Sequence, residues 1–180
     1  MPKIKNRFRV IVANFGYPGS TVGFTQQVIS AARPNVNFNP VTVDSYNSKA
    51  YYAGKAEWET VTITVRDDVT NAVSRLVGAQ VQKQMNWFEQ TTPLAAGDYK
   101  FSMHLEVLDG GGTATQDATI LEAWQFEGCF LATCNYEAFD YASADAMTIE
   151  MGIRFDNATQ LGGLMPDPAV FSINTPSLTA

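Results

Sequence analysis

The side chains that could perform acid–base, nucleophilic or metal chemistry are few, and they lack suitable partners. The single histidine, His104, is not accompanied by a Gly-x-Ser-x-Gly motif, so the sequence does not indicate a Ser-His-Asp triad. Neither cysteine lies at metal-ligand spacing from another ligand. The glycines at 110–112 lie between two expected strands, whereas a phosphate-binding loop opens a helix. We therefore expect no catalytic residue, no enzyme activity, no bound metal and no cofactor.

The two cysteines, Cys129 and Cys134, lie five residues apart around Gly128. They could face each other across a tight loop and form a disulfide bond. They could also remain two buried thiols, which is the usual state in a reducing cytoplasm. Two cysteines are too few for a disulfide framework, so the fold must depend on packing.

Length and composition are those of one globular domain. The chain has 180 residues, of which 46% are hydrophobic and 17% charged, enough for a sizeable core. We expect a single β domain over 1–160, N-terminal arm included, and a C-terminal tail over 161–180, where the periodicity fades. The N-terminus lacks the apolar region of a signal peptide, and no apolar run reaches membrane length. We therefore expect synthesis in a cytoplasm and no membrane partner.

The net charge of −6 is unevenly distributed. Between Lys100 and Asp156 ten acidic side chains stand against two basic ones. This half of the chain should repel nucleic acid phosphates. A solvated acidic face that serves solubility is the alternative interpretation. The N-terminus, in contrast, is basic through Lys3, Lys5, Arg7 and Arg9.

Hydrophobic periodicity predicts seven or eight strands and one helix. Apolar residues at helical spacing, preceded by Asp67 and Asp68 as N-cap and first-turn acid, predict a helix from Val69 to Glu89. A Gly-rich turn should join the strands near 99–107 and 118–126 into a hairpin, and Gly128 should end the second of them. This content is typical of a β-sandwich or barrel with a helix against one side or end. The other expected strands are 7–14, 22–29, 36–46, 58–66 and 147–156.

A long loop is expected from Ser45 to Ala56. It carries three tyrosines and a lysine that would suit a contact surface, because amphipathic rings are enriched where proteins touch one another. The alternative is that the rings fold back onto their own sheet. The four side chains are Tyr46, Lys49, Tyr51 and Tyr52.

With these elements in place, the chain resembles the tail tube proteins of contractile-tailed bacteriophages. The resemblance is most specific at 53–65, which is followed by Arg66-Asp67-Asp68 and the helix. The second specific stretch is 124–130, followed by Phe139-Asp140-Tyr141 and the strand at 147–156. The order of elements matches over most of the chain. The tail after Asp156 and the two cysteines depart from the family pattern.

The resemblance implies two antiparallel sheets packed at a steep angle, with one helix at their side. It also implies a structural virion protein, made in the host cytoplasm, that forms stacked hexameric rings. The rings would build an inner tail tube that conducts tape-measure protein and DNA, with the tail sheath, baseplate and tail-terminator proteins as partners. DNA would pass without specific binding. Candidates for carboxylates facing the lumen are Glu106, Glu122 and Glu150.

Two other functions stay open at this point. The same fold could form the inner tube of a contractile bacteriocin or of a secretion system. An aromatic content of 12% and the tyrosines of the 45–56 segment would also suit a monomeric carbohydrate-binding module.

Overall fold

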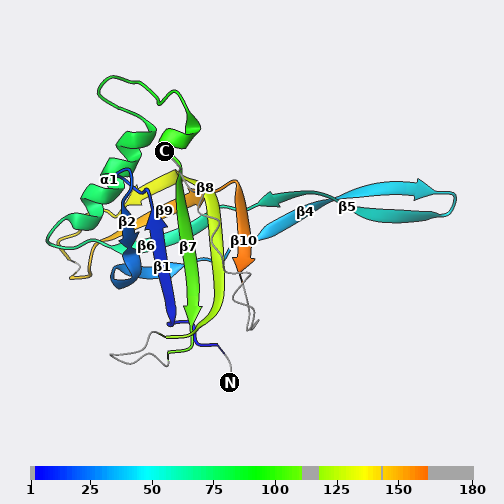
Figure 1. Ribbon diagram of the computed structural model, residues 1–180, viewed down its shortest axis with the longest axis horizontal. Coiled ribbons are helices and arrows are strands. Elements are labelled where there is room, and N and C mark those ends of the chain that lie inside the picture. Colours follow the sequence, from blue (N-terminus) through cyan, green and yellow to red (C-terminus); the bar gives the residue numbers. More distant parts are fainter. Residues whose placement is uncertain (1–2, 111–117, 143, 162–180) are drawn as a thin grey trace, which may run out of the picture.

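The computed structural model describes residues 3–110, 118–142 and 144–161, which form two antiparallel sheets, a long two-stranded arm and one α-helix (Figure 1). The predicted fold class, mainly β with two packed sheets and a helix at the side, is confirmed. The first sheet contains β1 (Phe8–Ala13), β2 (Thr21–Gly23), β7 (Phe101–Leu108), β10 (Asn157–Leu161) and the first part of β8 (Ile120–Tyr136). The second sheet contains the rest of β8 with β3 (Val28–Ala31), β6 (Val61–Arg66) and β9 (Thr148–Arg154). The arm consists of β4 (Val36–Ser45) and β5 (Ser48–Trp58), the helix is α1 (Ala72–Gln84), and the 3-10 turns are η1 (Phe24–Gln26) and η2 (Ala96–Asp98).

Strand β8 belongs to both sheets. Up to Cys129 it pairs with β7 on one side and β10 on the other, and from Phe130 onward it pairs with β9. Figure 1 shows the strands of the first sheet running steeply across those of the second. The change of direction falls at Gly128, whose φ of 66° favours glycine. The prediction that Gly128 ends the strand is wrong, because the glycine bends the strand and the pairing continues beyond it.

The core lies between the inward faces of the two sheets. Alternation along β7 and β6 buries every second side chain, as the period of two predicts. Phe126 and Phe155 stack edge to face at 4.9 Å between ring centres where β8 bends. Other buried members are Val10, Val12, Val61, Ile63, Val65, Met103, Ile149, Met151 and Ile153.

The helix is shorter than predicted at both ends. At its start, Asn71 adopts a left-handed conformation with φ 60°, and the Asp68 carboxylate accepts a hydrogen bond from the Ala72 amide at 3.1 Å. Residues 68–71 therefore form a turn ahead of the helix. At its end, the side-chain oxygen of Asn86 accepts bonds from the amides of Phe88 and Glu89. This Asx turn competes with helical hydrogen bonding and ends the helix before Thr91 and Pro93.

Two glutamines dock α1 on the sheets. The buried Gln80 accepts a bond from the Gly16 amide and donates one to the Tyr99 carbonyl, both at 2.8 Å. Gln84 accepts from the Leu131 amide at 2.8 Å and donates to the Leu131 carbonyl at 2.9 Å. One side-chain amide thus satisfies both backbone groups of a β8 residue, as a neighbouring strand would. Apolar contacts by Val73, Leu76, Val77 and Val81 complete the attachment, on the face that the periodicity predicts.

Two further segments differ from prediction. The single strand expected over 22–29 is instead β2, η1 and β3 in succession. A last strand, β10, was not predicted, and it places Leu161 in the first sheet. The division at 160 therefore falls inside a strand. The remainder of the expected C-terminal tail, 162–180, lies outside the described residues, and the single-domain boundary stays a prediction.

Candidate assembly interface

The most exposed element of the molecule is the arm formed by β4 and β5, which projects from the two sheets (Figure 1). The prediction of a loop over 45–56 is wrong, because these residues form the turn at Tyr46 and the strand that returns from it. The loop prediction failed because tyrosine, serine, lysine and glycine alternate there without a simple polar and apolar period. Gly54 permits the close pairing, since a Cβ at this position would lie 2.1 Å from the Asn39 carbonyl oxygen.

The arm exposes apolar side chains that its own chain leaves uncovered. The register pairs Val41 with Tyr52 and Val43 with Ala50, so these four residues share one face of the hairpin. Every residue of β4 is exposed, including Val36 and the other apolar ones. A two-stranded hairpin with both faces in water is marginally stable. This surface therefore has the composition of a contact surface.

The base of the arm, in contrast, is fixed to the body. Trp58 packs on Phe155 with ring centres 5.7 Å apart, which connects the arm to the aromatic contact at the β8 bend. Arg154 donates to Glu57 at 3.0 Å. These contacts set the direction in which the arm leaves the sheets.

The four side chains predicted to mediate assembly all lie at the outer half of the arm. Tyr46 is 100% exposed, Tyr51 68% and Tyr52 61%, so they do not fold back onto the sheets. Lys49 lies 3.7 Å from Asp44 across the hairpin. The alternation of Val41 and Val43 predicts the strand that carries them, but the sequence did not indicate that these two residues would be part of the exposed apolar face.

The three candidate lumen carboxylates lie in different environments. Glu106 on β7 pairs with Arg9 at 2.6 Å, and its side chain is largely buried. Glu122 on β8 is 6% exposed and pairs with Lys3 at 2.5 Å. Glu150 on β9 is exposed. The N-terminal cations thus neutralise two of the three, a pairing that the separate positions in the sequence do not reveal.

Glu122 holds the N-terminal segment against the first sheet. Besides Lys3, the indole N–H of Trp124 donates to its carboxylate at 2.7 Å. The bond from Lys3 lowers the pKa of Glu122 below its ordinary value of 4.5, against the opposing effect of burial. The carboxylate therefore stays charged and keeps the segment attached across the neutral range.

The expectation of a tight loop joining Cys129 and Cys134 is wrong. Both residues lie in β8, and both thiols are free. Five residues of extended chain span roughly 16 Å, whereas a disulfide needs Cα atoms within about 7 Å. Burial raises the pKa of Cys129 to about 12 and also raises that of Cys134, so both thiols stay protonated at neutral pH.

The described residues contain neither a metal-binding cluster nor a membrane-spanning helix. His104 lies on β7 between Ile11 and Gln125 of the neighbouring strands. Across residues 3–110, 118–142 and 144–161, no three potential metal ligands converge. No helix in the same ranges is long and apolar enough to cross a membrane.

Comparison with known proteins identifies the fold of the chain. No protein-family model matches the chain, and no curated protein matches its sequence. Among solved structures, a chain of the anti-feeding prophage baseplate matches with a TM-score of 0.66 at 9% identity, covering 92% of this chain and 99% of that one. A chain of the sheath–tube complex of the extracellular contractile injection system PVC matches with a TM-score of 0.60 at 15% identity, covering 89% and 91%.

A third match lies in the tube-terminating cap of the anti-feeding prophage, with a TM-score of 0.60 at 17% identity over 89% and 91% of the two chains. The fold is therefore that of components of contractile injection systems. It is not specific to bacteriophages, and the resemblance that the sequence suggested is supported at this coarser level.

Proposed function

We propose that this protein is the inner tube subunit of a contractile injection apparatus. The observation that carries the proposal is the arm, which exposes Val41, Val43 and Tyr52 on one face that no other described part of the chain covers. A protein that worked as a monomer would gain nothing from such an element and would risk aggregation. The likeness to chains from a baseplate, a sheath–tube complex and a tube-terminating cap supports the same role.

Open sheet edges supply a second type of contact. Within the described residues, β10 ends one side of the first sheet and β3 ends one side of the second. Unpaired strand edges favour pairing with another chain. We infer that copies join laterally into hexameric rings, and that the arms connect each ring to its neighbour in the stack. Tyr46, Lys49, Tyr51 and Tyr52 would then contact another copy.

We further propose that the tube belongs to a bacteriophage tail. It would lie in the virion within a sheath, between baseplate and terminator proteins, and conduct tape-measure protein and DNA. The fold alone fits a bacteriocin or secretion tube equally well. Glu150 is the lumen candidate that keeps an exposed carboxylate, and six copies in each ring would form a wall that repels phosphates. Replacing Glu150 with lysine should then slow DNA ejection from complete particles.

The decisive experiment for the general proposal is negative-stain electron microscopy of the purified full-length chain over a range of concentrations. The expected result is rings, or tubes with a continuous central channel. A protein that stays monomeric at every concentration and is retained on a glycan column would instead support the carbohydrate-binding alternative.

A further inference from the structure

A groove with basic rims and an apolar floor runs between the N-terminal segment and the two sheets. Its volume is about 590 Å³, and its floor is formed by Phe8, Leu105 and Val107. Its rims carry Lys3, Lys5, Arg7 and Arg33. Four cations around an apolar floor form a surface that fits a ligand both acidic and hydrophobic.

Two of these cations are bound to other groups of the chain, and two are exposed. Lys3 is bound to Glu122, and Arg7 donates to the Asp109 carbonyl oxygen. Lys5 and Arg33 are exposed and form no hydrogen bond or ion pair within the described residues. The paired cations therefore shape the groove. Lys5 and Arg33 form no direct bond and can contact a ligand, although Arg33 also lies within electrostatic range of Glu122.

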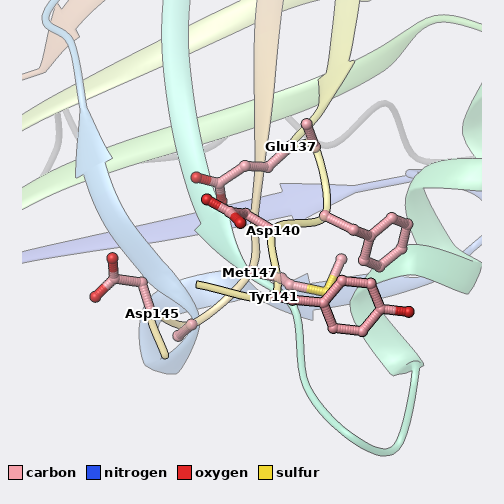
Figure 2. Close-up of a pocket in the computed structure, with 8 residues that line it drawn as sticks. Glu137, Asp140, Tyr141, Asp145 and Met147 are labelled. Atoms are coloured by element: carbon pink, nitrogen blue, oxygen red, sulfur yellow. The ribbon is translucent and has the colours of Figure 1, made fainter. Parts of the chain in front are cut away.

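The complementary surface lies elsewhere on the same chain, in the segment formed by residues 137–141 and 145–147 ahead of β9 (Figure 2). This segment contains Glu137, Asp140 and Asp145 and no lysine or arginine. Its aromatic side chains point into solvent, with Phe139 87% and Tyr141 112% exposed. In Figure 2 the carboxylates of Glu137 and Asp140 lie on one side of the segment and the Tyr141 ring extends to the other.

The geometry points to this acidic aromatic segment, supplied by a second copy of the chain, as the occupant of the basic groove. Both the charge and the polarity match, since an acidic segment that exposes Asp140 would meet Lys5 and Arg33, and two exposed rings would meet an apolar floor. The arm fits less well, because Lys49 pairs with Asp44 and its charges cancel. The inference rests on the proposed function in that it names one contact by which copies assemble.

A contact of this type has a geometric consequence. The groove and the segment are different surfaces, so each copy that gives its segment to one neighbour still offers its groove to another. Such heterologous contacts continue until they close into a ring or extend into a filament. A reciprocal two-fold dimer, in which each copy takes the segment of the other, would be the smallest closed form, and the size of the oligomer distinguishes it from a ring.

The test uses one variant for each half of the contact. Lys5→Glu with Arg33→Glu reverses the free cations of the groove, and Asp140→Lys reverses the segment. These three side chains are exposed, and none of the described bonds of the core involves Lys5 or Arg33, so both variants should fold. Circular dichroism and thermal unfolding verify this. The matched controls are Arg75→Glu and Asp98→Lys, which reverse exposed charges outside both surfaces and outside the arm.

Sedimentation velocity and native mass spectrometry then report the assemblies. We expect each variant alone to lose the higher oligomers that the parent protein and the controls form. A 1:1 mixture should regain higher oligomers that contain both variants, because the native groove of one pairs with the native segment of the other, and the reversed groove pairs with the reversed segment. A chain that combines Lys5→Glu and Arg33→Glu with Asp140→Lys should regain higher oligomers. Dissociation by added salt should follow the charged contact.

The outcomes separate this inference from the proposed function. If both variants assemble as the parent does, or if their mixture stays monomeric, the groove–segment contact is wrong, although tubes made through other contacts would keep the proposed function. If the parent forms groove–segment oligomers but no rings or tubes, the contact stands and the tube function is wrong. A third outcome is that a short single-stranded DNA binds the groove while the mixture forms no oligomers that contain both variants. The groove would then be a nucleic acid site, and the inference would be wrong.

Discussion

The bend of β8 and the outer half of the arm differ in what stabilises them. At the bend, Phe126, Phe155 and Gly128 are enclosed by two sheets of the same chain, and the contacts there are complete within one copy. In the arm, Val41 and Tyr52 pair with each other and remain more than half exposed among the residues that the structure describes. One part of the molecule is therefore stabilised by contacts within the chain, whereas the other leaves an apolar face exposed.

The largest effect should come from truncating the core at the bend. Phe126 is fully buried and stacks on Phe155, so Phe126→Ala should lower the free energy of unfolding by about 3–5 kcal/mol through lost burial and a cavity. The control is Phe139→Ala, which removes the same side chain from an exposed position. Chemical denaturation of both measures the difference. Equal stability of the two variants would contradict the assignment of the bend as the centre of the core.

The next effect concerns the attachment of α1. Gln84→Ala leaves the Leu131 amide and carbonyl of β8 without their partner and should cost about 1–3 kcal/mol. Gln82→Ala, on the exposed side of the same helix, should change stability by less than about 0.5 kcal/mol. Amide hydrogen exchange at Leu131 adds a local measurement, and unchanged protection there would show that the Gln84 bonds do not hold the strand.

A smaller effect is expected at Glu122. Because the folded pKa lies below the ordinary value of 4.5, the ion pair stabilises the fold above that pH, and the contribution is lost as the pH falls through the folded value. Glu122→Gln should cost about 1 kcal/mol at pH 7, a modest amount because Lys3 is partly exposed. The cost should become smaller as the pH is lowered below 4.5. Thermal unfolding measured from pH 7 to pH 3 checks this, and an equal penalty at both pH values would argue against the ion pair.

Sequence periodicity revealed the part of the molecule that completes itself. The alternating residues of β6, β7 and β9 pack on each other, so a buried face could be predicted from 61–66, 101–108 and 148–154 alone. In the arm, the strand over 36–46 was predicted, whereas the returning strand was predicted as a loop because its residues show no simple polar and apolar period. Gly128 was taken as a strand end because glycine marks both ends and bends.

The groove could not be predicted from the sequence, because residues far apart in the chain form it. Its cations at 3–7 and at Arg33 meet only through long-range pairing of β1 with β7 and of β3 with β6. The sequence shows the excess of acidic residues in the second half of the chain. It does not show that Arg9 and Lys3 neutralise Glu106 and Glu122, because these pairs depend on how the N-terminal residues lie along β7 and β8. Placement of charges on a surface needs the fold.

The smallest effect on the single chain, and the largest on assembly, should come from the arm. Tyr51→Ser with Tyr52→Ser removes rings that are more than half exposed, so the free energy of unfolding should change by less than about 0.5 kcal/mol. Rings or tubes should nevertheless be lost in electron micrographs. Tyr17→Ser is the control, since Tyr17 is 59% exposed on the body. Tubes of normal length from the double variant would remove the distinction between the two regions.

The sharing of β8 between the sheets has a mechanical consequence. When two sheets contact each other only through side chains, a pull on one can slide it past the other. Here a tension applied to the first sheet at β7 reaches the second sheet at β9 along the covalent backbone of Ile120–Tyr136. The force must then shear hydrogen bonds on both sides of Gly128 together before either sheet separates. The body should therefore behave as one stiff unit under load, and yielding should begin in the arm.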